Sequence, residues 1–288
     1  MNRLVITILC GFIFVADETA SAADIGPDNG VLVIVGGAAG PDILKEFVDL
    51  AGGPDAPIVV IPTASGASTY DRFHRVARRF REAFGVSDVV VLHTYDRAEA
   101  DSTAFVEPIR KARAVWFSGG RQWRLADAYL GTRTQRELEA LLARGGVIGG
   151  SSAGATIQGS YLARGDTSTN TIMMGDHVEG FGFLRNAAID QHVLRRNRQF
   201  DLIEIIKAHP ELLGIGLDEN TGIIVTGDSF RVVGESYVAI YDHNRLMAND
   251  GRFYFLAPGD TFDLTKRLAT RSTPNSEPFS SVKLETWP

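Results

Sequence analysis

Val147-Ile-Gly-Gly-Ser-Ser-Ala-Gly-Ala155 is an apolar strand that runs into a serine with small neighbours, where a helix is predicted to begin. This is the sequence form of a nucleophile elbow, a sharp strand-to-helix turn that lifts the Ser152 hydroxyl above the sheet. Gly150 and Gly154 leave the backbone room for such a turn. The amide of Ala153, at the helix start, is suited to stabilise an oxyanion. Gly-x-Ser-x-Gly also arises by chance in glycine-rich loops, so an ordinary turn is the alternative interpretation.

Short β-branched runs precede this strand and alternate with helical patterns. The runs are Val31–Val35, Ile58–Ile61, Val89–Leu92 and Ala114–Phe117. Continuous apolar runs are typical of parallel strands with both faces covered. The alternation predicts an α/β fold with a doubly wound, mostly parallel sheet, in which functional groups gather at the carboxyl ends of the strands.

Two of the helical patterns have distinctive features. The first has apolar residues at helical spacing and arginines on the remaining surface: Phe73, Val76, Ala77, Phe80 and Phe84 against Arg72, Arg75, Arg78, Arg79 and Arg81. We interpret these arginines as a solvated helix face, with a binding patch as the alternative. The second helix opens at Thr132-x-x-Gln135, which resembles a capping box, and ends at Ala143-Arg-Gly-Gly146.

After about Gly214 the pattern changes to closely spaced strands separated by turn signals. The predicted strands are Gly222–Thr226, Phe230–Val233, Tyr237–Tyr241 and Arg252–Leu256. No linker-like segment separates them from the preceding residues. We therefore predict a C-terminal antiparallel β extension of a single domain that spans residues 23–288.

The first 22 residues are predicted to be a secretory signal peptide. Arg3 gives a positive start, Leu4–Ala16 is a largely apolar run, and Ala20-Ser-Ala22 offers a cleavage site. The run is too short to span a bilayer, which takes about 20 apolar residues. We expect the mature protein to be secreted or periplasmic, with no membrane association after cleavage. Cys10 is the only cysteine, so the mature chain would have neither a disulfide nor a thiol nucleophile.

The composition excludes several other classes of function. The net charge is −6, and removing Arg3, Asp17 and Glu18 with the signal peptide leaves −5. This mildly acidic balance argues against nucleic-acid binding and against adhesion to anionic membranes. The sequence contains no His-x-x-x-His, Cys-x-x-Cys, calcium-loop or Walker A pattern, so we predict neither a metal nor a cofactor.

Two later strands end in side chains that suit the partners of a serine nucleophile. Ala188-Ile-Asp-Gln-His192 runs from an apolar strand into a polar cluster, and Gly214-Ile-Gly-Leu-Asp-Glu219 ends in two acids. A serine nucleophile needs a base and a group that orients the base. Alternation aims Asp218 and Glu219 to opposite sides, so one acid can face the site while the other braces a loop. We interpret His74, His93, His209 and His243 as structural or solvent-facing, and leave His177 open.

These segments together resemble peptidase family S51, the cyanophycinase and aspartyl dipeptidase family of serine peptidases. The matching stretches occur in the family's order: Val33–Gly37, Val60–Ser65, Trp116–Leu125, Gly149–Ala155, Ile189–His192 and Gly214–Glu219. They cover most of the mature chain, and the match to cyanophycinases is closer. The resemblance implies a class I glutamine-amidotransferase-like, flavodoxin-like fold.

The resemblance also implies a Ser-His-Glu triad. Ser152 would be the nucleophile, His192 the general base, and Glu219 the carboxylate that orients the imidazole. Asp166 and Asp218 are the alternative acids. Gly120 would provide a second oxyanion-hole amide beside that of Ala153.

The substrate implied by the resemblance is cyanophycin, a poly-aspartate chain with arginine joined to each β-carboxylate, from which the family releases β-Asp-Arg. The family's substrate positions fall on Gln122, Asp190, Gln191, Arg196 and Arg198. Arginines offer forked donors to carboxylates, and Asp190 suits a cation; for Arg195, Arg196 and Arg198, salt bridges at a helix start are the alternative. The chain departs from the family in having Arg121 instead of an acid and Asp201 instead of an arginine.

The sequence therefore predicts a secreted serine exopeptidase that acts through an acyl-enzyme, with cyanophycin as the expected substrate. One alternative is a peptidase for other α-aspartyl or isoaspartyl peptides. The other is a catalytically silent protein that binds charged peptides. The expected partner is a peptide substrate, and a homodimer is implied by resemblance only.

Overall fold

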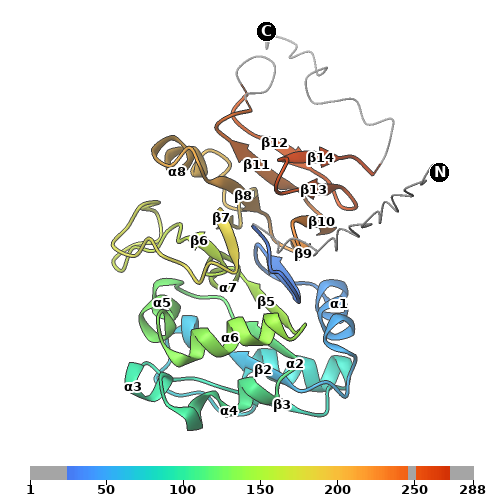
Figure 1. Cartoon of the computed structure of the whole chain (residues 1–288), viewed down its shortest axis with the longest axis vertical. Helices are drawn as coiled ribbons and strands as arrows, with labels where there is room; N and C mark the ends of the chain where they lie inside the picture. The colour runs from blue at the N-terminus through green and yellow to red at the C-terminus, as the bar shows by residue number, and fades with distance from the viewer. Residues whose placement is uncertain (1–24, 246–250, 273–288) are drawn as a thin grey trace, which may run out of the picture.

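The computed structural model describes residues 25–245 and 251–272, so the predicted signal peptide lies outside the described residues. In these ranges the strands form two sheets (Figure 1). The elements up to the serine turn are β1 (Val31–Val35), α1 (Pro41–Ala51), β2 (Ile58–Ile61), the 3-10 turn η1 (Thr63–Ser65), α2 (Arg75–Phe84), β3 (Val89–Val91), α3 (Arg97–Ala100), α4 (Thr103–Lys111), β4 (Ala114–Phe117), α5 (Trp123–Tyr129), α6 (Arg133–Ala143) and β5 (Val147–Ser151). The later elements are α7 (Ala153–Thr156), β6 (Gly159–Tyr161), β7 (Leu184–Gln191), α8 (Leu202–Ala208), β8 (Leu213–Leu217), β9 (Thr221–Thr226), β10 (Ser229–Gly234), β11 (Val238–Asp242), β12 (Tyr254–Leu256), β13 (Thr261–Asp263) and β14 (Leu268–Thr270).

The predicted parallel strands form one half of the larger sheet, whose order is β14-β13-β10-β9-β1-β5-β4-β2-β3. Strands β1, β5, β4, β2 and β3 all pair in parallel, which confirms the α/β prediction. Leu32 and Ile34 pack into the core that includes residues of α4, α5 and α6, whereas Val33 and Val35 pack with α1 and α2. Helices therefore cover both faces, as a doubly wound sheet requires.

Strand β3 differs from the prediction of a run buried on both faces. It pairs only with β2 and forms the edge of the sheet, and the Val90 side chain is exposed. An edge strand lies beyond part of the helix layer, so a β-branched run there does not imply full burial.

The C-terminal strands are antiparallel, as predicted, but they are shared between two sheets. Strands β9, β10, β13 and β14 extend the larger sheet from β1, while β11 and β12 join a second sheet of order β12-β11-β8-β7-β6. In that second sheet β6, β7 and β8 are parallel to one another. The chain passes from β8 to β9, and so between the sheets, through a turn at Asn220, whose φ is +47°.

The second sheet packs on the antiparallel half of the larger sheet. A single apolar core contains Ile223 of β9, Phe230 of β10, Ile189 of β7 and Ile215 of β8. Figure 1 shows the consequence: α1 to α6 gather around β2–β5, while β8 to β14 and α8 form the other half of the molecule. The carboxyl ends of β7 and β8 are thereby brought towards β1 and β5.

Two local predictions need correction. Phe73 lies outside α2 and is 59% exposed, because the helix begins at Arg75, after the extended His74. Thr132 is the N-cap residue of α6 as predicted, but its hydroxyl donates to the Tyr129 carbonyl and Gln135 accepts from the Gly131 amide. The reciprocal bonds of a capping box are therefore not formed, since a tight turn before the helix takes both side chains.

Within the described ranges, no helix has the length and apolar content that a bilayer span requires.

Candidate active site

Ser152 lies in the turn between β5 and α7. Its backbone angles, φ +59° and ψ −115°, are rare for a residue with a side chain. A methyl group at Gly150 would overlap the Gly154 carbonyl, and one at Gly154 would overlap Phe117. The small residues in the motif are therefore needed for the turn, which is the geometry of a nucleophile elbow.

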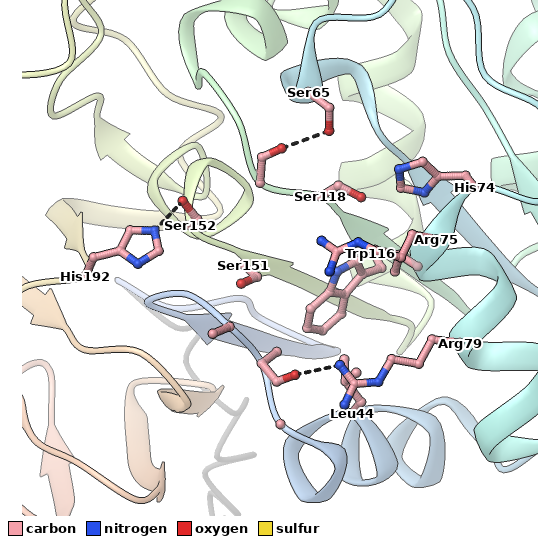
Figure 2. Close-up of a pocket in the computed structure, with 15 residues that line it drawn as sticks. Leu44, Ser65, His74, Arg75, Arg79, Trp116, Ser118, Ser151, Ser152 and His192 are labelled. Atoms are coloured by element: carbon pink, nitrogen blue, oxygen red, sulfur yellow. Dashed lines mark hydrogen bonds between the residues drawn. The ribbon is translucent and has the colours of Figure 1, made fainter. Parts of the chain in front are cut away.

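The side chains of Ser152, His192 and Glu219 form a chain of hydrogen bonds. Ser152 Oγ lies 2.9 Å from His192 Nε2 (Figure 2). His192 Nδ1 lies 2.8 Å from Glu219 Oε1. The imidazole is buried, whereas Glu219 is partly open to solvent. A hydroxyl, an imidazole and a carboxylate in this order can remove the hydroxyl proton and stabilise the imidazolium that results.

The two alternative acids have other partners. Asp218 accepts hydrogen bonds from the Arg195 amide at 2.8 Å and from Ser236 Oγ at 2.7 Å, so it braces a loop. Asp166 accepts from the amides of Ser168 and Thr169 in its own turn. Of the three acids considered from the sequence, Glu219 alone contacts His192 in the described residues.

Three of the other histidines contact residues other than Ser152 and Glu219. His177 Nε2 lies 2.7 Å from Asp127, His93 Nδ1 lies 2.9 Å from Thr63 Oγ1, and His209 lies 3.6 Å from Glu211. His243 is exposed in a turn after β11. His74, in contrast, lines the cavity that contains Ser152, a placement that the sequence pattern did not indicate.

Backbone carbonyls at the end of β1 accept hydrogen bonds from amides at or directly after Ser152, His192 and Glu219. The carbonyl of Val35 accepts from the Ser152 amide at 2.9 Å and that of Gly36 from the His192 amide at 3.0 Å. The carbonyl of Gly37 accepts from the Asn220 amide, directly after Glu219, at 2.8 Å. We call residues 35–37 the β1 clasp. A side chain at Gly37 would overlap the His192 ring, so the clasp also needs a glycine there.

The surroundings of His192 favour its neutral form. Burial lowers the pKa of His192 below its usual value of about 6.5, and the positive charge of Arg196 lowers it further; Glu219 acts in the opposite direction. A neutral imidazole is the form that can accept the serine proton, so the environment maintains a competent base down to mildly acidic pH.

This shift gives a prediction for the pH dependence. If His192 is the base, the acidic limb of kcat/KM should lie below pH 6.5, since activity would be lost only when His192 is protonated in the folded protein. Arg196→Gln should move that limb to higher pH by removing a repelling charge. A limb above pH 6.5, or one that Arg196→Gln leaves unmoved, would contradict the assignment.

The lowered pKa of His192 also makes stability depend on pH. Well above pH 6.5 His192 is neutral in both the folded and the unfolded state and does not affect the free energy of unfolding. As pH falls below 6.5 the unfolded chain binds the proton before the folded chain does, so the free energy of unfolding decreases until the folded pKa is passed.

Of the two predicted oxyanion-hole residues, Ala153 directly follows Ser152 as the first residue of α7. Gly120 follows Ser118 and Gly119, which line the same cavity as Ser152, and packs against Ala64. A Cβ at Gly119 would stand 3.2 Å from the Ser152 Cβ, and the Gly119 carbonyl accepts from Ser65 Oγ at 3.0 Å. That bond fixes the peptide that carries the Gly120 amide. The oxyanion role of Gly120 and Ala153 stays a prediction.

The predicted substrate residues divide into buried and accessible groups. Gln122 is fully buried, and its Nε2 donates to the carbonyls of Ala163 and Arg164. Asp190 and Gln191 are also buried. Arg196 and Arg198 line a cavity, together with Arg164, Thr171, Met173, Asn197, Phe200, Asp201 and Glu204. No ion pair of Arg196 or Arg198 with a carboxylate is formed within the described ranges, while Arg195 lies 4.0 Å from Glu219.

Arg164 is the residue that sequence reasoning missed. Its guanidinium binds Asp190 in a bidentate pair, with Nε to Oδ1 at 2.7 Å and Nη2 to Oδ2 at 2.8 Å, and Nη2 also contacts Asp201 at 2.5 Å. Arg164 is 1% exposed and Asp190 is fully buried. The cation expected for Asp190 is thus a side chain of the protein itself, and Asp201 completes the cluster.

Arg121, the other departure from the family pattern, has a structural contact. Its Nη2 donates to the carbonyls of Asp166 at 2.6 Å and Thr169 at 2.5 Å. It therefore holds the loop after β6. Arg121 lines neither the cavity that contains Ser152 nor the cavity that contains Arg196 and Arg198.

Two cavities lie beside the hydrogen-bonded chain. The first, about 490 Å³, contains Ser152 and His192 and extends between α1 and α2 (Figure 2). The second, about 540 Å³, is the one lined by Arg196 and Arg198. They share no lining residue: His192 lines the first, whereas Arg196, Asn197 and Arg198 line the second. In the described ranges no group of three histidine, cysteine or acidic side chains is arranged to hold a metal ion.

Comparison with known proteins identifies related chains. Residues 32–233 match the model of peptidase family S51. A cyanophycinase of Geminocystis herdmanii is 32% identical over 256 residues, which cover 81% of this chain and 93% of the relative. A cyanophycinase of Nostoc sp. is 31% identical over 261 residues, covering 82% of this chain and 86% of the relative.

Solved structures share the fold. A crystal structure of a peptidase from an acI-B1 Actinobacterium superposes with a TM-score of 0.63 at 24% identity and covers 82% of this chain and 97% of its own. A putative peptidase E protein from Listeria monocytogenes gives a TM-score of 0.52 at 18% identity, covering 72% of this chain and 99% of its own.

Proposed function

The chain belongs to peptidase family S51, and we propose that it is a serine peptidase that cleaves aspartyl-linked peptides, with cyanophycin as the substrate and β-Asp-Arg as the product. The observation that carries this proposal is the chain of hydrogen bonds from Ser152 through His192 to Glu219. These contacts are those of a nucleophile, its base and the acid that orients the base.

The proposed reaction proceeds through an acyl-enzyme. Ser152 Oγ attacks the carbonyl carbon of the scissile amide as its proton passes to His192 Nε2. Glu219 accepts the Nδ1 hydrogen bond and stabilises the imidazolium. The C–N bond then breaks as Nε2 returns the proton to the leaving amine. Water attacks the ester by the same route, and Ser152 recovers its proton. The amides of Gly120 and Ala153 would stabilise the oxyanion in both steps.

The charges of the second cavity support a substrate of this kind. Arg196 and Arg198 offer donors to carboxylates, and Glu204 offers negative charge to a guanidinium, whereas Asp201 is already paired with Arg164. A β-Asp-Arg unit carries both kinds of group. The two cyanophycinase relatives agree with this choice of substrate.

One observation favours a second candidate, a peptidase for α-aspartyl or isoaspartyl peptides without arginine. Arg164 occupies both carboxylate oxygens of Asp190, an acid that the family resemblance assigned to the substrate. An arginyl side chain would thus have to bind elsewhere. Nothing specific supports a silent binding protein, since such a protein has no need for the contacts between Ser152, His192 and Glu219.

The test is incubation of residues 23–288 with cyanophycin and with a panel of α- and β-aspartyl peptides, with products identified by mass spectrometry. His192→Ala, which lacks the proposed base, is the control. We expect β-Asp-Arg from the wild type alone. Cleavage of short aspartyl peptides but not of cyanophycin would leave the second candidate. Binding without cleavage of any substrate would refute both.

Export is proposed from the sequence of residues 1–22, which carry the features of a secretory signal peptide. The mature protein would then act outside the cytoplasm, in a periplasm or beyond the cell. Detection of a mature N-terminus at Ala23 in an exported fraction would test this proposal.

A further inference from the structure

The arginine-rich helix α2 contributes to the active-site cavity. From sequence these arginines were interpreted as a solvated face, and Arg78, paired with Glu82 at 3.8 Å, fits that interpretation. Arg75 and Arg79 do not, because both line the same cavity as Ser152. Figure 2 shows Ser152 and His192 at one end of this cavity and Arg75 and Arg79 at the other.

The α2 end of the cavity carries positive charge without a compensating acid. Its lining includes no aspartate or glutamate. Among the described residues, neither Arg75 nor Arg79 forms an ion pair, although Arg79 Nη1 donates to the Ala39 carbonyl at 3.0 Å. Unpaired guanidinium groups at the wall of a cavity favour an anionic ligand, and a planar carboxylate matches their forked donors.

Two polar atoms in the same wall also lack a protein partner. Ser118 is 4% exposed, and its hydroxyl has no hydrogen bond to the described residues; the same holds for His74 Nδ1. Buried polar atoms are nearly always hydrogen-bonded, so each such exception needs a ligand or a water to complete it. Both residues line the α2 end, beside Arg75.

We propose that the α2 end of the cavity is a subsite for a free carboxylate of the substrate, bound by Arg75 and supported by Arg79 and Ser118. The inference rests on the proposed function, since Ser152 provides the reacting end of the same cavity. It is separate from the cavity of Arg196 and Arg198, with which it shares no residue. A carboxylate anchor at the opposite end of the cavity from Ser152 would select substrates that carry a free acid one cavity length away from the scissile bond.

The test compares the α-linked dimer of β-Asp-Arg, a piece of cyanophycin that contains one scissile α-aspartyl bond, with analogues that each have one free carboxylate replaced by a carboxamide. For the wild type, one carboxamide should raise KM by about tenfold, the range expected for a charge-assisted hydrogen bond near solvent. Arg75→Gln should raise KM for the free acid by a similar factor and change kcat little. It should leave KM unchanged for the carboxamide analogue that binds weakly to the wild type. Arg78→Gln, on the same helix but outside the cavity, is the matched control and should behave as the wild type.

A binding experiment keeps the inference separate from the proposed reaction. Calorimetry with Ser152→Ala, in the presence and absence of Arg75→Gln, measures affinity for the same dimer and its carboxamide analogues without turnover. If the protein binds the free acid more tightly than a carboxamide, and this preference depends on Arg75, while the wild type does not cleave the dimer, the subsite would be upheld and the peptidase refuted. Cleavage of the dimer with equal KM for the free acid and every carboxamide, or an Arg75→Gln variant indistinguishable from Arg78→Gln, would refute the subsite and leave the peptidase intact.

Discussion

Ser152→Ala should lower kcat by about 10⁴- to 10⁶-fold, because it removes the atom proposed to form the acyl-enzyme while the rest of the site is retained. The loss is expected in kcat, and KM should change little, since no substrate-binding group is removed. Activity on the preferred aspartyl substrate, followed with enough enzyme to detect slow turnover, measures the effect.

Loss of folding would mimic this result, so two controls accompany it. Thermal unfolding and circular dichroism of Ser152→Ala should match those of the wild type, since the hydroxyl's described side-chain contact is with His192. Ser229→Ala, an exposed serine of β10, should retain full activity. A folded Ser152→Ala that still cleaves at a tenth of the wild-type rate would rule out Ser152 as the nucleophile.

Arg164→Met should reduce the free energy of unfolding by about 3–5 kcal/mol, the usual effect of removing one partner from a buried ion pair. The cause is Asp190, which is fully buried and would lose both hydrogen bonds from Arg164, keeping the one from the Gln191 amide. Denaturation by urea, monitored by tryptophan fluorescence, gives the difference.

Two comparisons isolate this effect. The double variant Arg164→Met, Asp190→Leu should recover much of the lost stability, because replacing a whole buried pair with apolar residues is often neutral. Arg110→Met, which breaks a surface pair with Glu137, should cost less than about 1 kcal/mol. If Arg164→Met proves no more destabilising than Arg110→Met, the buried cluster does not contribute to stability as argued.

Local patterns were sufficient to predict the parallel half of the fold and the chemistry-bearing turns. A β-branched run such as Ile58–Ile61 is long and apolar enough to specify a strand without knowledge of its neighbours. The elbow at Ser152 depends on small residues within four positions, and His192 and Glu219 each end an apolar strand. The parallel strands, the turn at Ser152 and the strand ends at His192 and Glu219 could therefore be predicted from the sequence.

Features that depend on contacts between segments far apart in the sequence could not be predicted from local patterns. The predicted strand ends at His192 and Glu219 belong to a second sheet, and no local signal distinguishes β7 or β8 from strands of the first sheet. Likewise, Gln122 and Asp190 looked like polar site residues, but contacts from the segment around Arg164 bury both. Only the tertiary structure reveals that Arg164, in an irregular segment after β6, donates hydrogen bonds to both carboxylate oxygens of Asp190.

The β1 clasp has a consequence for when the enzyme becomes active during synthesis. Its three carbonyls join residues made early in translation to Ser152, His192 and Asn220, and β9, which follows directly, pairs along β1. A nascent chain that has not yet emerged beyond Thr226 has no completed β9 to close the turn holding Glu219. It follows that the unfinished polypeptide is latent, and that hydrolytic competence arrives late, as a property of the nearly complete chain.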